Sequence, residues 1–222
     1  MPGTETVLFD LDGTLCLHEQ DHDALLERTF DRVGVEPFAD ERAFRAAATV
    51  APDADSETDF LANAFEIAAK RAGVDRAPVD ELAKTYRSQV DPTAVRFRAG
   101  ARDALDHVAD RPVGLVTNGG RDHQREKLRA LGIEDRFDTV VYAGDETPSK
   151  PSPEPFEIAL DALDARATST VHVGNSLPDD IAGANGVGLE SVWVPTDDDR
   201  RDTAAATPTH TIDSLERFPT LF

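Results

Sequence analysis

Cysteine and long apolar runs are scarce in this sequence. Cys16 is the only cysteine among 222 residues, which excludes an intrachain disulfide. No stretch stays apolar over the roughly 20 residues that a membrane-spanning helix needs, and no internal repeat is visible. Residues 1–6 lack the basic start and apolar stretch of a signal peptide. We therefore expect a soluble, cytoplasmic protein with no membrane partner.

Basic residues are also few. The chain has 23 lysines and arginines against 43 acidic residues, which gives a formal net charge of −20. So negative a protein repels nucleic acids, and nucleic-acid binding is not expected. The acidic residues are spread along the whole chain, a composition that favours the strongly hydrated surface of a halophilic protein. The alternative is an acidic protein without salt adaptation.

Apolar residues recur with two different periods. The run at 6–9 predicts a strand buried on both faces. Helical spacing follows between residues 18 and 96, where no strand is evident, and helices then alternate with strands, as is typical of a parallel sheet with crossover helices. We predict strands at 6–9, 113–116, 139–142, 170–173 and 191–194, and helices at 23–33, 41–49, 57–72, 79–90, 101–109, 122–131, 153–163 and 179–185.

The predicted fold class is α/β. Residues 1–16 and 97–222 form a Rossmann-like parallel-sheet core, and residues 17–96 form a small helical cap domain. In open parallel sheets, ligands bind beyond the carboxyl ends of the strands, and this is where Asp10, Thr117 and Gly174 fall. We expect the helical insert to cover such a site as a lid.

Two carboxylates follow the first strand, in the segment Phe9-Asp10-Leu11-Asp12-Gly13-Thr14-Leu15. Asp10, at the tip of the strand, can attack phosphorus in line and form an aspartyl phosphate. Asp12, past the strand end, can protonate the leaving alkoxide and then deprotonate the hydrolytic water. In so acidic a chain this pair means little alone, but the buried strand before it and Gly-Thr after it strengthen the interpretation.

This segment resembles the first motif of the haloacid dehalogenase (HAD) superfamily. Three further segments resemble its other motifs, in family order: Val116-Thr117-Asn118-Gly119, Ser149-Lys150-Pro151 and Val173-Gly174-Asn175-Ser176-Leu177-Pro178-Asp179-Asp180. Gln124, Lys127 and Leu128 continue the family pattern after the second of these. The resemblance covers nearly all of the chain outside the helical insert.

Each further motif has an expected role. The hydroxyl of Thr117 and the backbone amides around Asn118 and Gly119, at a strand-to-helix junction, form a cradle for phosphate. Lys150 is expected to hold the Asp10 carboxylate and the phosphoryl oxygens, which offsets their mutual repulsion in the transition state.

The resemblance also implies Mg²⁺ as cofactor, bound by Asp10, by the backbone carbonyl of Asp12, and by Asn175 and Asp180. Asn175 stands where the family most often has aspartate, so the site loses one negative charge. An amide carbonyl still coordinates a hard cation, but more weakly than a carboxylate does. Asp180 then becomes more important, either as a direct ligand or as the holder of a metal-bound water.

Four other polar residues have weaker signals. His18 is expected in an exposed loop, and His172 is expected as a core residue of its strand. Arg96 and Arg98, near the return from the insert, either meet a substrate anion or belong to a solvated linker.

These residues together predict a phosphatase for a small phosphorylated metabolite: a phosphosugar, phosphoglycolate or a nucleoside monophosphate. Three alternatives stay open. A phosphomutase would pass the phosphoryl group to a second hydroxyl, and a metal-free dehalogenase would share the nucleophile, although Asp12 argues against it because that chemistry releases no alkoxide. A catalytically decayed binding module is motivated by Asn175. The substrate, the closure of the cap and the oligomeric state, monomer or homodimer, are not determined.

Overall fold

The computed structural model describes residues 3–52, 54, 56–196 and 206–221. The chain divides into two compact units, one formed by Met1–His18 and Thr93–Phe222 and the other by Glu19–Pro92. We call them the core unit and the helical insert. The insert was expected to begin at residue 17 and the core to resume at residue 97; the structure begins the insert at 19 and resumes the core at 93.

A two-stranded ribbon accounts for this difference. The strand β2, Cys16–His18, pairs antiparallel with β3, Val95–Phe97. The expectation that residues 18–96 contain no strand is therefore wrong at both ends, and His18 lies in a strand rather than in a loop. Each strand has only three residues, too few for a periodic pattern to be visible in the sequence.

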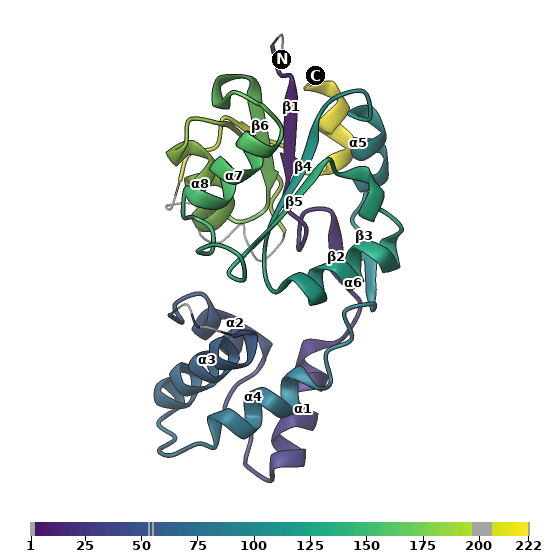
Figure 1. The fold of residues 1–222 in the computed structure, drawn as a ribbon. Coiled ribbons are helices and arrows are strands. Elements are labelled where there is room, and N and C mark those ends of the chain that lie inside the picture. Colours follow the sequence, from purple (N-terminus) through teal and green to yellow (C-terminus); the bar gives the residue numbers. More distant parts are fainter. Residues whose placement is uncertain (1–2, 53, 55, 197–205, 222) are drawn as a thin grey trace. The chain divides into compact units, whose positions relative to one another are not determined.

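The core unit confirms the predicted α/β fold class. Within the described residues, six strands form one parallel sheet in the order β5-β4-β1-β6-β7-β8 (Figure 1). The strand bounds are Thr6–Phe9 for β1, Val113–Asn118 for β4, Thr139–Ala143 for β5, Thr170–Gly174 for β6, Glu190–Trp193 for β7 and His210–Thr211 for β8. Only β8 was not expected, since it has two residues.

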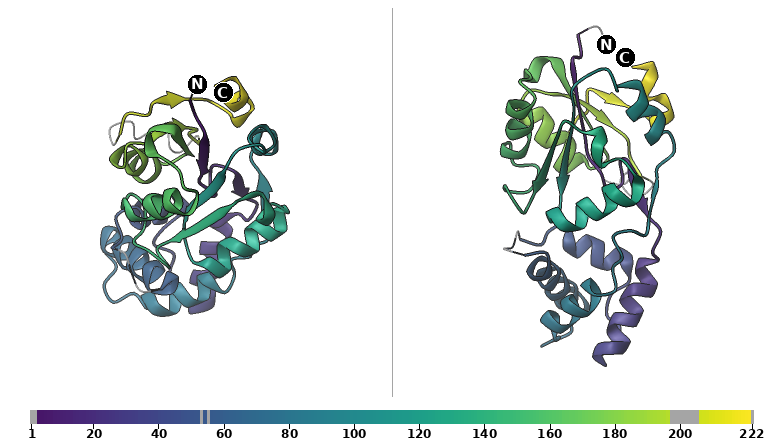
Figure 2. Two further views of the ribbon diagram at one scale, coloured as in Figure 1. Left: turned by 45° about the horizontal axis from the view of Figure 1, so that its top comes forward. Right: turned by 45° about the vertical axis from the view of Figure 1, so that its right-hand side comes forward.

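Helices cover both faces of this sheet (Figure 2). Side chains alternate along β1, so Val7 and Phe9 pack on one face and Leu8 packs on the other. The first face packs against α5, α6 and the 3₁₀ segment Leu215–Thr220, and the second packs against α7 and α8. The helix bounds are Ala101–His107 for α5, Arg121–Leu131 for α6, Glu154–Ala162 for α7 and Ala182–Gly186 for α8. Burial on both faces explains why β1 is continuously apolar.

The helical insert has its own core. Its helices are α1, His22–Val33; α2, Glu41–Ala48; α3, Glu57–Ala72; and α4, Val79–Arg87. Asp21, Asp40 and Ser56 cap the first three at their N-termini. Phe30, Phe44, Phe65 and Tyr86 pack together inside. The longest helix of the described part of the chain is α3, with 16 residues, and none there is long and apolar enough to cross a membrane.

Candidate active site

The turn after β1 positions the two predicted catalytic carboxylates. The N–H of Asp10 donates to the carbonyl of Val173 on β6, at 2.9 Å. Gly13 has a φ of +80°, and its N–H donates to the carbonyl of Cys16 at 2.8 Å. A Cβ atom at Gly13 would lie 2.8 Å from the side chain of Asn175. Glycine at this position therefore allows both the turn and the close approach of the segment after β6.

Lys150 joins two carboxylates at the carboxyl ends of the strands. Its Nζ donates to Asp10 Oδ1 at 2.8 Å, to Asp180 Oδ1 at 2.6 Å and to the carbonyl of Val116 at 2.9 Å. The Lys150 side chain is 2% exposed. Asn118 fixes the backbone of Lys150, because its Oδ1 accepts from Lys150 N–H at 2.9 Å and its Nδ2 donates to the Lys150 carbonyl at 3.2 Å. The structure thus brings Asp10, Lys150 and Asp180 together.

Asp180 is held by donors on every side. Besides Lys150, the N–H of Ser176 donates to Oδ2 at 2.9 Å, and His172 Nε2 lies 3.1 Å from Oδ1. An ionised carboxylate only accepts hydrogen bonds, so His172 carries its proton on Nε2; burial lowers the pKa of His172, although Asp180 opposes this, and favours the neutral ring. His172 was expected as a core residue; it is fully buried and also orients Asp180.

The buried trio of Asp10, Lys150 and Asp180 has one ammonium for two carboxylates, hence a charge of −1 when all three are ionised. Burial raises the pKa of Asp10 to about 7, with the Asp180 charge adding to the rise and Lys150 opposing it. Burial also raises the pKa of Asp180, but Lys150 and His172 outweigh this effect and hold it well below its usual range. Of the two carboxyl groups, Asp10 is therefore the one whose negative charge Lys150 does not fully compensate.

Asp12 has separate partners. Lys127 Nζ lies 2.8 Å from both of its carboxylate oxygens, Gln124 Nε2 donates to Oδ2 at 2.8 Å, and His18 Nε2 lies 3.1 Å from Oδ1. Burial raises the pKa of Asp12, but Lys127 and His18 outweigh it and hold the pKa well below its usual range. The family pattern pointed to Gln124 and Lys127, but only the structure shows that they contact Asp12.

The predicted phosphate cradle lies at the end of β4. Thr117 is fully buried, and its Oγ1 accepts from Gln124 Nε2 at 2.6 Å. The N–H of Gly119 donates to the carbonyl of Ala143 at 2.9 Å, so this amide is engaged by β5. The Asn118 side chain is engaged by Lys150. The phosphate-binding roles of Thr117, Asn118 and Gly119 stay predictions.

The candidate magnesium ligands are all oxygen donors from the segments that follow β1 and β6. Asn175 Oδ1 accepts from Thr14 Oγ1 at 3.1 Å, and its main-chain carbonyl accepts from Trp193 Nε1 at 2.7 Å. Within the described residues no three His, Cys, Asp or Glu side chains are grouped as metal ligands; the predicted set instead mixes carboxylates with an amide and a carbonyl. Hard oxygen donors beside an excess negative charge fit Mg²⁺.

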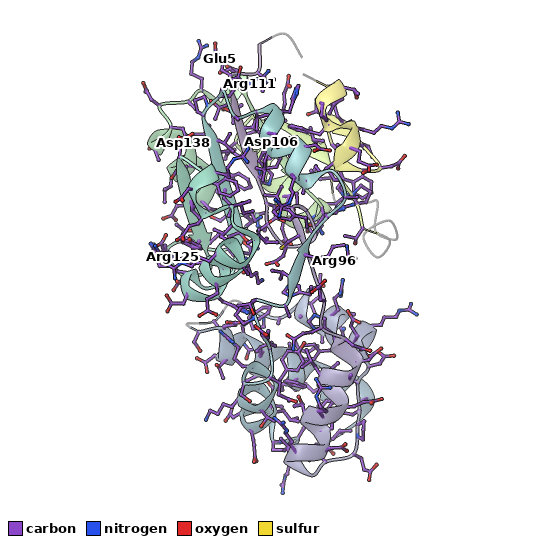
Figure 3. All side chains as sticks on the ribbon, turned by 90° about the vertical axis from the view of Figure 1, so that its right-hand side faces the viewer. Glu5, Arg96, Asp106, Arg111, Arg125 and Asp138 are labelled. Carbon is purple, nitrogen blue, oxygen red and sulfur yellow. The ribbon has the colours of Figure 1, made fainter. Side chains whose placement is uncertain are left out.

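The two arginines near the return from the insert differ. Arg98 donates through Nη1 to the carbonyls of Gly13 and Val194, both at 2.6 Å, so it fixes the turn after β1. Arg96 is exposed on β3 (Figure 3). Arg96 is thus exposed but lies in a paired strand rather than in a linker, whereas Arg98 has a structural contact with the motif that follows β1.

Comparison with known proteins identifies relatives of this chain. Residues 4–188 match the family of haloacid dehalogenase-like hydrolases. The chain is 29% identical over 209 residues to validoxylamine A 7'-phosphate phosphatase of Streptomyces hygroscopicus, an alignment that covers 91% of each protein. It is 33% identical over 108 residues to N-acylneuraminate-9-phosphatase of Rattus norvegicus, covering 48% of this chain but only 44% of that relative. A ribulose-1,5-bisphosphate 5-phosphatase of Halopiger xanaduensis is 36% identical over 108 residues, covering 48% and 45%.

Solved structures share the fold. A HAD phosphatase from Thermococcus onnurineus superposes with a TM-score of 0.68 at 24% identity, covering 98% of this chain and 97% of that one. CbbY from Rhodobacter sphaeroides, in complex with phosphate, superposes with a TM-score of 0.73 at 23% identity and covers 96% of both chains. Because the family match extends over most of the chain, this protein belongs to the haloacid dehalogenase-like hydrolases.

Proposed function

We propose that this protein is a magnesium-dependent phosphatase that hydrolyses a small phosphomonoester through an aspartyl phosphate on Asp10. The observation that carries the proposal is the position of Lys150, whose ammonium donates to both Asp10 and Asp180 at the carboxyl ends of the strands. Such a buried cation can hold the nucleophile and offset charge on a phosphoryl group. The phosphatase names of the relatives support the same reaction class.

In the first half-reaction, Asp10 forms a bond to phosphorus and the bond from phosphorus to the ester oxygen breaks. Lys150 holds Asp10 Oδ1, which leaves Oδ2 as the attacking atom. Asp12 gives its proton to the departing alkoxide. Asp12 is ionised while Lys127 holds it, so it first takes up a proton from solvent when substrate binds. A nearby phosphate charge raises the pKa of a carboxyl group and favours this uptake.

In the second half-reaction, a water molecule attacks phosphorus and the bond from phosphorus to Asp10 breaks. Asp12, again a carboxylate, takes a proton from this water. Inorganic phosphate leaves, Asp10 is restored, and Asp12 returns the proton to solvent. Lys127, Gln124 and His18 keep Asp12 ionised and fixed in place, which leaves it free to accept a proton but also lowers its basicity.

Magnesium would be held by Asp10, the Asp12 carbonyl and Asn175. Asp180 serves as a further ligand or as the holder of a bound water, and its contacts with Ser176 and His172 keep it in place. When bound, the cation supplies positive charge that stabilises the phosphoryl oxygens. That charge also offsets the −1 of the buried trio.

The substrate is a small phosphorylated metabolite. One relative acts on ribulose 1,5-bisphosphate according to its name, so a phosphosugar is the first class to test among the three that the sequence suggests. This choice rests on partial alignments of the chain, since 45% of that relative is covered.

The test is phosphate release from 4-nitrophenyl phosphate at high KCl, with and without magnesium. Asp10→Asn should abolish release, and acid-quenched wild type, but not this variant, should carry a covalent phosphate by mass spectrometry. Asp106→Asn, which removes an exposed carboxylate of the core unit on α5, serves as the matched control and should retain activity (Figure 3). Magnesium-independent release, or full activity in Asp10→Asn, would contradict the proposal.

A further inference from the structure

The carboxylate of Asp12 is contacted by side chains from two other elements of the core unit. Lys127 and Gln124 come from α6, and His18 comes from β2. We call these three residues the Asp12 clamp. Asp12 itself lies in the turn after β1. Its side chain is held in place by contacts with these other residues.

Lys127 is an unusual choice for a buried position. It is 3% exposed, and its ammonium lies 2.8 Å from both oxygens of Asp12. Burying a lysine costs free energy unless the charge is paired. One ammonium equidistant from both oxygens acts as a point charge that holds the end of the side chain in place, and the contacts of Gln124 with Oδ2 and of His18 with Oδ1 then orient the plane of the carboxylate.

Gln124 connects the clamp to the predicted phosphate cradle. Its Nε2 lies 2.8 Å from Asp12 Oδ2 and 2.6 Å from Thr117 Oγ1. Gln124 is 1% exposed and one turn of α6 before Lys127. Residues three apart share one face of a helix, so α6 presents both donors to Asp12 at once.

We propose that Lys127 and Gln124 are positioning residues that aim the Asp12 carboxyl group at the oxygen of the departing alcohol. This inference rests on the proposed function, in which Asp12 is the proton donor. A misplaced donor loses most of the gain from general acid catalysis, which is on the order of 100-fold or more. The loss falls on substrates whose leaving group needs a proton, and it spares a leaving group that departs as a stable anion.

The test compares two substrates in one variant. Lys127→Met should lower kcat/KM for a primary alkyl phosphate by roughly 100-fold, because the loss of positioning outweighs the easier protonation of Asp12 once the ammonium is gone. For 4-nitrophenyl phosphate the loss should be about tenfold or less, because 4-nitrophenolate leaves without a proton. The ratio kcat/KM reports the steps through departure of the alcohol. Gln124→Met removes a donor without changing the charge and should give a smaller loss in the same direction.

Arg129→Met is the matched control. It removes one positive charge from the same helix at an exposed ion pair with Glu134, and it should leave both substrates unchanged. Equal losses on the two substrates in both Lys127→Met and Gln124→Met would overturn the positioning role.

A second measurement separates this inference from the proposed function. Lys127→Met should lower the melting temperature when it is introduced into the wild-type chain. Its effect should be much smaller when it is introduced into Asp12→Asn, because the carboxylate that pairs with Lys127 is then gone. Equal shifts of the melting temperature in the wild-type and Asp12→Asn chains would show that Lys127 and Asp12 are not coupled, and would overturn the inference. If wild type hydrolyses neither ester although this coupling is found, the proposed function is refuted and the contact stands.

Discussion

Replacing the proposed nucleophile should make the metal-free protein more stable. In the trio of Asp10, Lys150 and Asp180, one ammonium serves two carboxylates, and the side chains of all three are at most 7% exposed. Asp10→Asn keeps the shape of the side chain and an oxygen that accepts from Lys150. It removes the uncompensated negative charge, so the folded state should gain free energy relative to the unfolded chain.

The size of the gain follows from the pKa of Asp10. Its rise from 3.8 to about 7 in the folded protein corresponds to at most about 4 kcal/mol at full ionisation. A carboxyl group whose folded pKa is raised destabilises the fold as pH rises above the unfolded value. The advantage of Asp10→Asn should therefore be small near pH 4, grow toward pH 7 and level off above it.

The assay is guanidinium unfolding of both proteins in EDTA at several pH values and at one KCl concentration. Trp193 is the only tryptophan and lies in the core unit, so its fluorescence reports the unfolding of that unit. Magnesium should narrow or reverse the difference in stability between the two proteins. A cation that binds only the folded wild type, at a free concentration of 100 times its Kd, adds about 2.7 kcal/mol to the free energy of unfolding.

The result that would refute this reasoning is a less stable Asp10→Asn in EDTA above pH 7. It would mean that Lys150 compensates Asp10 fully and that Asp180 does not compete for it. A gain in stability that does not change with pH would mean that the ionisation of Asp10 is not its cause.

Three further predictions concern other parts of the chain. The free energy of unfolding should rise from dilute to multimolar KCl, because salt screens the repulsion within a chain of net charge −20; highest stability in dilute buffer would contradict the salt adaptation. Gly13→Ala should destabilise the fold by about 1–2 kcal/mol and lower phosphatase activity, since φ is +80° there and the new methyl group would meet Asn175; Gly120→Ala, where no heavy atom lies within 4 Å of an added Cβ, is the control for both denaturation and kinetics. Cys16, which is 0% exposed, should react with a thiol reagent only at the rate of unfolding, and a rapid reaction of the native protein would contradict its burial.

Local patterns in the sequence were sufficient for the fold class and for several site residues. A strand buried on both faces is continuously apolar, so the run at 6–9 was recognisable, and the capped helices of the insert followed from their spacing. The position of Asp10 at the end of that strand also followed. Lys150 was identified by the motif around it, and the structure places it 2.8 Å from Asp10; the chemical roles of both residues await experiment.

Only the tertiary structure determined how distant residues pair. Lys127 and Asp12 are 115 positions apart, and their contact depends on how α6 packs against the end of β1, which no local pattern encodes. The same holds for His172, whose strand places it beside Asp180. The ribbon of β2 and β3 was not predicted because its three-residue strands stabilise each other across the 76 positions that separate His18 from Val95. The sequence by itself determined the longer helices and strands and which chemical groups stand at their ends, because these depend on local periodicity. The tertiary structure decided the short strands and which of those groups meet, because both depend on packing between elements remote in the chain.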